Sequence, residues 1–66
     1  MAVKVPTKVL EGIVAVRDSG KTNMLDVNAV QYYAYQMEYF ATVVWIEENR
    51  KLYARGIFEG FETDEE

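Results

Sequence analysis

Hydrophobic residues recur at helical spacing along most of the chain and divide it into three or four helical stretches. Over residues 7–18 the apolar positions follow the three-and-four spacing of a helix with one buried face. Pro6 suits the first turn of this helix, where its missing N–H costs nothing. Ser19 and Gly20 predict the helix end, because glycine adopts the left-handed conformation of a C-terminal cap without strain. Gly12, inside the helix, weakens it by up to about 1 kcal/mol relative to alanine.

A second helix is expected after a short polar linker. Asp26 is a good N-cap, because its carboxylate can accept hydrogen bonds from the first backbone amides of a helix. A stripe at i, i+3, i+7 and i+10 then predicts the buried face, which consists of Val27, Val30, Ala34 and Met37. At Glu38 the phase of the apolar pattern is lost, which indicates a bend.

The segment from Tyr39 to Asn49 predicts a third helix. Its β-branched middle would also suit a buried strand, but its flanks and its lack of turn residues favour a helix. The side chains expected to face inward are Phe40, Val43, Val44 and Ile46. Residues 50–59 keep the helical spacing, with Tyr53, Ile57 and Phe58 on one side. Asn49 therefore either caps a fourth helix or lies within one long rod.

The two ends of the chain carry weaker patterns. Residues 1–6 alternate apolar and polar positions, which suits a strand or an extended arm, and the segment is too short to separate the two. Gly60 predicts the end of the last helix, and residues 61–66 are acidic and are expected to form a disordered tail. The sequence thus predicts an all-α domain over residues 1–60, a small bundle of three to four short helices.

The apolar content is large for so short a chain. Half of the 66 residues are hydrophobic, and they include five Tyr, three Phe and one Trp. A chain of this size buries only about 60% of the surface that its unfolded form exposes. Part of the apolar surface should therefore stay exposed on a monomer and mark an interface. Since there is no Cys or His, neither a disulfide nor the usual zinc ligands can supplement the core, and we expect a homo-oligomer.

The net charge of −4 is unevenly distributed. Residues 1–21 carry four basic and two acidic groups, a sum of +2, and residues 22–66 carry three basic and nine acidic groups, a sum of −6. This balance disfavours direct nucleic-acid binding. No apolar run is long enough to span a membrane, and no signal-peptide core is present. We expect a cytoplasmic protein of the host cell.

The residues that most enzymes use are missing from this composition. Without Cys and His the chain lacks the usual nucleophilic thiol and the usual general base near neutral pH. Gly20-Lys21-Thr22 matches the end of a phosphate-binding P-loop, but Ala15 occupies the position at which that motif needs its first glycine. We therefore expect no enzymatic activity, no catalytic residues, no cofactor and no metal site.

The tyrosines predict a binding surface. Tyr32, Tyr35 and Tyr39 are spaced i, i+3, i+7, about 100° or more around the helix from its buried stripe. Tyrosine suits interfaces because its ring packs while its hydroxyl stays hydrated. These three residues and Trp45 form the predicted partner or oligomer interface, and a purely intrachain core is the alternative.

Two sets of charged residues are further candidates for binding. The first could contact an anionic ligand if subunits bring several copies together, and it consists of Lys8, Arg17 and Lys21. The second is an acidic face of Glu47, Glu48, Glu59 and Glu62. This face is a solvated surface that keeps the protein soluble, a decoy for the basic groove of a nucleic-acid enzyme, or an ordinary charged interface.

The run from Val9 to Gln31 resembles an uncharacterised small domain family encoded by phages and prophages of Gram-positive bacteria. The block Ser19-Gly20-Lys21-Thr22-Asn23-Met24 is its most distinctive part, and residues 46–53 and 57–60 fit the same pattern. Glu38 departs from the pattern, which has a glycine before the aromatic pair. The resemblance implies a phage or mobile-element origin and supplies no biochemical activity.

Resemblance and composition together lead to a functional expectation. We expect a non-enzymatic phage accessory protein that binds and inhibits a host factor, most concretely a bacterial anti-phage defence component, in the manner of an anti-CRISPR inhibitor. Its partner would then be a protein of the host or of the phage. Two alternatives stay open: an oligomeric sponge that sequesters a nucleotide signal, and a structural or regulatory protein-interaction module.

Overall fold

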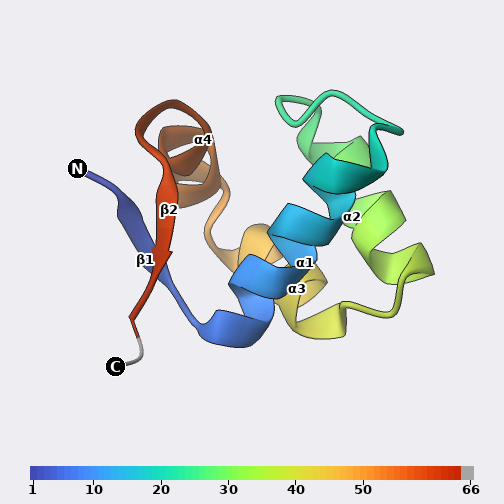
Figure 1. Cartoon of the computed structure of the whole chain (residues 1–66), viewed down its shortest axis with the longest axis horizontal. Helices are drawn as coiled ribbons and strands as arrows, with labels where there is room; N and C mark the ends of the chain where they lie inside the picture. The colour runs from blue at the N-terminus through green and yellow to red at the C-terminus, as the bar shows by residue number, and fades with distance from the viewer. Residues whose placement is uncertain (65–66) are drawn as a thin grey trace.

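Four short helices and a two-stranded parallel sheet make up the fold of the computed structural model, which describes residues 1–64 (Figure 1). In chain order the elements are β1 (Val3–Val5), α1 (Thr7–Ser19), α2 (Val27–Gln36), α3 (Phe40–Glu48), α4 (Arg50–Glu59) and β2 (Phe61–Thr63). The helices α1, α2 and α3 pack against one another, and the strand pair lies beside α4 (Figure 1). The expected small helical bundle is confirmed, with a small sheet in addition.

Helices α1 and α3 cross at close range where Gly12 faces Thr42. A Cβ atom on Gly12 would collide with Oγ1 of Thr42 and would lie 2.9 Å from Cβ of Tyr39. Thr42 is fully buried, and its hydroxyl donates a hydrogen bond of 3.0 Å to the carbonyl of Val9. Gly12 therefore lowers the intrinsic stability of α1 but allows the two helices to approach.

The second helix begins and packs as its sequence predicts. The Asp26 carboxylate accepts a hydrogen bond of 3.1 Å from the amide of Ala29, which is the expected N-cap. Val30 and Ala34 are fully buried, and the outer members of the stripe, Val27 and Met37, pack partly buried against the core. Gly20, at the end of the preceding helix, has the expected left-handed φ of 67°.

The bend between α2 and α3 is centred on Glu38. This residue has a φ of 66°, in the left-handed region that side chains disfavour. The chain reverses there, and the amide of Tyr39 bonds back to the carbonyl of Ala34 at 2.8 Å. The expected bend is confirmed, and it places α3 alongside both α1 and α2.

Residues 40–59 form two helices rather than one rod, because the helical conformation is interrupted at Asn49. Its φ of −139° is not helical, and its side-chain amide donates to the carbonyl of Trp45 at 3.0 Å. The Asn49 side chain therefore gives a carbonyl group in the last turn of α3 a hydrogen-bond donor, and it makes no side-chain cap for α4.

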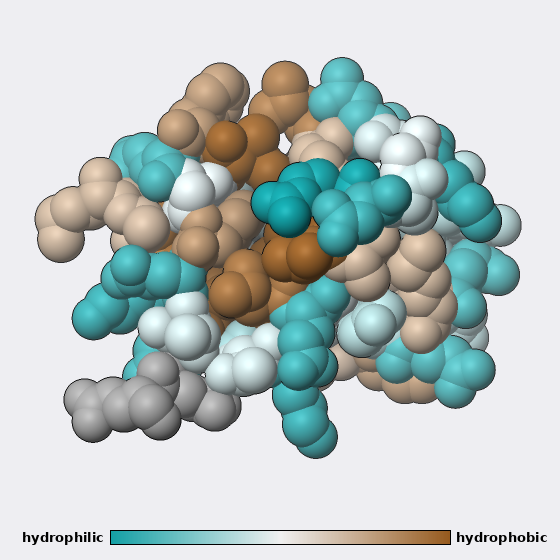
Figure 2. Space-filling model, in the orientation of Figure 1, coloured by the Kyte–Doolittle hydropathy of each residue, from teal (hydrophilic) through white to brown (hydrophobic). Residues whose placement is uncertain are grey.

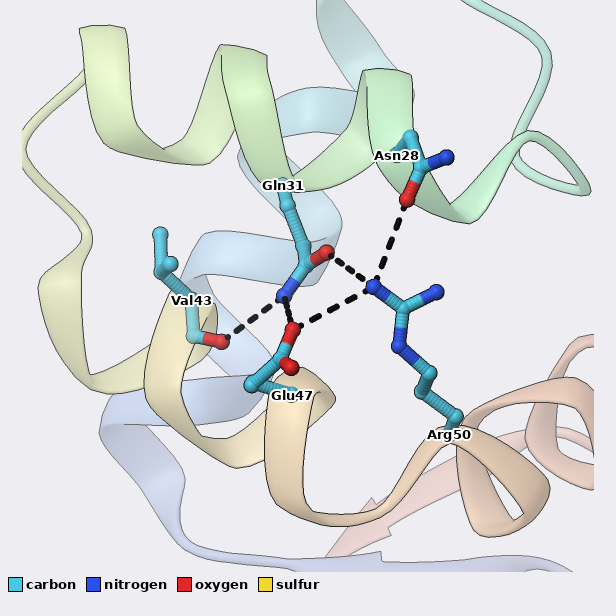
Figure 3. Close-up of polar contacts among 5 residues, drawn as sticks. All are labelled: Asn28, Gln31, Val43, Glu47 and Arg50. Atoms are coloured by element: carbon cyan, nitrogen blue, oxygen red, sulfur yellow. Dashed lines mark hydrogen bonds and ion pairs between the residues drawn. The ribbon is translucent and has the colours of Figure 1, made fainter.

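A polar clamp on the surface ties α2, α3 and α4 together (Figure 3). One guanidinium nitrogen of Arg50 donates to Asn28 at 3.3 Å, to Gln31 at 3.1 Å and to Glu47 at 3.2 Å. The Gln31 amide also donates to the Val43 carbonyl and to Glu47, both at 3.2 Å. These bonds connect the start of α4 to both α2 and α3.

The strands β1 and β2 join the two ends of the described chain. They pair in parallel, with Val3 opposite Phe61 and Val5 opposite Thr63. The N-terminal segment is therefore a strand and not a free arm. The expected disordered tail is wrong for residues 61–63, because Phe61 packs against the core and a strand partner is available. Residues 65–66 lie outside the described part.

Two side chains that were expected to face inward lie on the surface instead. Phe40 is 51% exposed and Val44 is 55% exposed. Phe58, expected on the same side of its helix as Tyr53, is 78% exposed. On α3 the buried positions are Thr42 and Ile46, since the close crossing with α1 turns this side of the helix inward.

The buried side of α4 holds Tyr53, which is fully buried. Its hydroxyl donates to the carbonyl of Met24 at 2.6 Å and so attaches the loop after α1 to the core. Burial raises the pKa of Tyr53 to about 12.

Candidate functional site

An apolar groove of about 620 Å³ runs along the exposed side of α3, beside the start of α1. We call it the α3 groove. Its lining residues are Pro6, Lys8, Val9, Phe40, Ala41, Val44, Trp45 and Glu48. Phe40 and Val44, spaced i, i+4 on α3, form its exposed apolar wall. Three of these residues come from α1 and the residue just before it, and the other five belong to α3.

The second helix extends this apolar surface. The ring of Tyr35, which is 58% exposed, packs edge-on against Phe40, with ring centroids 5.4 Å apart and planes at 68°. Such an edge-to-face pair holds both rings in defined positions. The bend at Glu38 brings these two rings together, because it reverses the chain between α2 and α3.

Trp45 lies between the groove and the core. It is partly buried, and its ring contacts Phe61 edge-on at a centroid distance of 6.4 Å and an angle of 79°. Phe61 in turn packs against the ring of the buried Tyr53, at 5.8 Å. Trp45, one residue of the groove lining, is thus connected through Phe61 to the buried ring of Tyr53.

Two opposite charges accompany the apolar lining of the groove. Lys8 comes from α1 and Glu48 from the end of α3, and both are exposed. An apolar centre with charged groups at its edge is the usual composition of a protein–protein interface. A partner could therefore form one ion pair with the basic Lys8 and one with the acidic Glu48.

The predicted tyrosine interface is only partly assembled in the structure. Tyr35 and Trp45 lie at or beside the groove, as described above. Tyr32 is 57% exposed and packs edge-on against Tyr33, outside the groove lining. Tyr39 is partly buried and packs against the core. Phe40 and Val44 were expected in the core and were not named as site residues. Their i, i+4 spacing, continued by the charged Glu48 at i+8, indicates a second face of α3 that reaches the surface.

The three basic residues predicted to contact an anion do not meet within one chain. Lys8 and Arg17 are nine residues apart on α1, which places them on opposite sides of the helix at about 100° per residue. Lys8 lines the α3 groove, Arg17 lines a separate cleft, and Lys21 is exposed in the loop after α1.

The four predicted acidic residues have four different surroundings. Glu47 belongs to the polar clamp, and the hydrogen bonds from Gln31 and Arg50, together with the Arg50 charge, lower its pKa. Glu59 accepts a hydrogen bond of 2.8 Å from the N-terminal ammonium group, and this bond lowers its pKa as well. Glu48 lines the α3 groove, and Glu62 is exposed on β2.

Fold and groove together define a small four-helix domain that is closed by a parallel strand pair and has an exposed apolar groove. Over residues 6–61 the chain matches the family described as a domain of unknown function (DUF5049), and it belongs to that family. The expected membership of an uncharacterised domain family is thereby confirmed. Comparisons with curated proteins and with solved structures gave no match. Within residues 1–64 no helix has the length and apolar character needed to cross a membrane.

Proposed function

We propose that this protein is a non-enzymatic accessory protein of phage or prophage origin that binds a host protein through the α3 groove and inhibits it. The most concrete target is a component of a bacterial anti-phage defence system. One observation carries the proposal: Phe40 and Val44 are each more than half exposed, side by side on α3, above the partly buried Trp45.

The energetics support a binding role for these side chains. Fully burying a Phe or Val side chain stabilises a complex by roughly 1.5–3 kcal/mol. Most of the binding free energy of an interface comes from a few central residues, and side chains that are already held in position lose less entropy on binding. The contacts of Phe40 with Tyr35 and of Trp45 with Phe61 supply that fixed arrangement.

In the absence of the target we expect a second copy of the chain to cover the α3 groove. A two-fold arrangement that sets Lys8 of each copy against Glu48 of the other would match the charges of the two grooves. Light scattering should then give twice the chain mass, and Phe40→Asp should give the monomer mass. A monomeric native protein would remove self-association from the proposal and leave target binding to be tested separately.

A phage infection assay tests the inhibitory function. Bacteria that carry one of a panel of defence systems are infected with a phage that the system restricts, with and without expression of this protein. We expect the native protein to restore plaque formation against at least one system. Phe40→Asp should abolish the effect, because a carboxylate at the centre of the groove opposes burial.

The matched control is Phe58→Asp, which makes the same exchange at a more exposed phenylalanine outside the groove lining. It should restore plaques as the native protein does, and circular dichroism should show both variants folded. Equal activity of Phe40→Asp and the native protein, or no restoration in any system, would contradict the proposal.

A further inference from the structure

A second hollow, of about 370 Å³, lies between α1, α4 and β2. We call it the Arg17 cleft. On the face shown in Figure 2, strongly hydrophobic residues gather between the strand pair with α4 on one side and α1 on the other, with hydrophilic residues around them. The cleft and the α3 groove share no lining residue, so the cleft is a separate feature of the molecule.

The walls of the cleft are apolar side chains from elements that are distant in the sequence. Leu10 and Val14 come from α1, Ile57 from α4 and Phe61 from β2, and all four are only partly buried. This apolar surface is consequently left uncovered inside a concave site, in which a ligand could contact several walls at once.

Glycines help to keep the cleft open. Gly56 and Gly60 both belong to its lining, and neither contributes a side chain. A Cβ atom on Gly60 would have no neighbouring heavy atom within 4 Å, so open space lies next to this backbone.

The charged side chain of the lining is Arg17, which follows Leu10 and Val14 at i+7 and i+3 on the same side of α1. Its Nε atom is 3.4 Å from the carboxylate of Asp18, and both side chains are largely exposed, so this ion pair is weak. Within residues 1–64 the two terminal guanidinium nitrogens make no hydrogen bond. The lining includes no carboxylate.

We infer that the Arg17 cleft binds a small amphipathic carboxylate, with its apolar body between the walls and its carboxylate on the Arg17 guanidinium. The apolar walls favour a hydrocarbon chain, because contact removes both surfaces from water. A guanidinium pairs with a carboxylate through two parallel hydrogen bonds, a geometry that the terminal nitrogens of Arg17 can provide. The volume lies within the range of about 300–1,000 Å³ found for small-molecule pockets. This inference does not rest on the proposed function.

An NMR titration of the ¹⁵N-labelled full chain tests the inference, with octanoate as the ligand and 1-octanol as its uncharged counterpart. Octanoate should give saturable shifts of the Gly56 and Gly60 amides. Arg17→Gln keeps a polar side chain and removes the charge, and it should weaken octanoate binding by roughly tenfold, as the loss of about 1.4 kcal/mol of charge-assisted hydrogen bonding predicts. The same variant should leave 1-octanol binding unchanged.

The control is Lys8→Gln, which makes the same change of charge on the opposite side of α1 and should bind octanoate within twofold of the native protein. Since Arg17 and Lys8 are both exposed, both variants should keep the native circular dichroism spectrum. The inference is overturned if octanoate gives no saturable shifts, if both variants weaken it equally, or if the shifts map to the α3 groove. Shifts at the cleft that depend on protein concentration without octanoate would also overturn it, because a second copy would then occupy the site.

Discussion

Gly12 and Thr42 show how much of this fold depends on single residues. A hydrogen atom in place of a side chain lets α1 lie against α3, and the buried hydroxyl of Thr42 then reaches the backbone of α1. In isolation glycine is a poor helix residue. Gly12 stabilises the fold through the tertiary packing of α1 against α3, and helix propensity does not include this contribution.

Gly12→Ala should therefore destabilise the protein. Alanine favours the helix by about 1 kcal/mol, but overpacking a close contact typically costs about 1–3 kcal/mol. Because the colliding atoms belong to a fully buried side chain and to the Cβ of Tyr39, we expect a net loss, measured as a lower midpoint of urea unfolding.

A double-mutant cycle checks the cause. Thr42→Ala makes room for the new methyl group, so Gly12→Ala should cost less in the Thr42→Ala background than in the native protein. Strictly additive costs would show that the contact between these two residues is not the reason.

Glu38 is a second single residue that affects the stability of the fold, in this case through its backbone conformation. A left-handed conformation costs an ordinary L-residue roughly 1–2 kcal/mol and costs glycine almost nothing. Glu38→Gly should raise the free energy of unfolding by about 0.5–1 kcal/mol, after part of the gain is offset by the greater freedom of glycine in the unfolded chain.

Thermal unfolding of Glu38→Ala provides the comparison, because alanine removes the carboxylate and keeps the Cβ atom. This variant should show no such gain. If it were as stable as Glu38→Gly, the backbone conformation would not be the source of the effect.

The polar clamp connects α3 and α4 across the break at Asn49, and it includes a carboxylate, Glu47, whose charge depends on pH. Glu47 has a pKa below its ordinary value of 4.5 in the folded protein, because Gln31 and Arg50 stabilise its charged form. The resulting stabilisation is complete above the unfolded-state pKa and is lost as the pH falls through the lower folded-state value.

We expect the free energy of unfolding to fall more steeply below about pH 5 in the native protein than in Glu47→Gln, which cannot titrate at this position. Urea denaturation over a series of acidic pH values measures the two slopes. Glu59 is present in both proteins, so its own low pKa does not affect the comparison. Parallel slopes would show that the clamp is not coupled to folding.

The sequence predicts some elements much better than others. Asp26, Gly20 and the apolar stripe of α2 each act within a few residues, so their local chemistry suffices to place that helix and the end of α1. The third helix is different: apart from Thr42, residues 40–46 are all apolar and surround the helix, so periodicity could not decide which face is buried. For this reason Tyr35 and Trp45 were identified as candidate site residues, whereas Phe40 and Val44 were expected in the core.

At the scale of the whole molecule, the strand pair was missed although one part of its pattern is visible. The alternation of Val3, Lys4 and Val5 matches their buried, exposed, buried arrangement. A three-residue strand, however, becomes recognisable only with its partner, and β2 lies at the other end of the described chain in a segment dominated by acidic residues. No local signal connects the two.

Phe61 and Phe58 provide a direct test of this long-range closure. Phe61 is partly buried against Tyr53 and Trp45 and lies over Gly56, whereas Phe58 is 78% exposed. Phe61→Ala should cost roughly 2–3 kcal/mol of folding stability, somewhat less than a fully buried Phe→Ala exchange. Phe58→Ala should change it by no more than about 0.5 kcal/mol.

Chemical denaturation of the two variants measures the difference. Similar stabilities would mean that residues 61–63 do behave as a tail in solution, and the Arg17 cleft would then lose one of its walls.

The parallel pairing of β1 with β2 also sets an order of events as the chain is made. The ribosome synthesises β1 first, but its partner emerges only after all four helices, so the pair cannot form during most of translation. Closing such a long loop costs more entropy than the local contacts between neighbouring helices. Until residues 61–63 have emerged, β1 lacks its partner strand, and a prematurely terminated chain would keep this strand edge exposed as a ready target for chaperones and proteases.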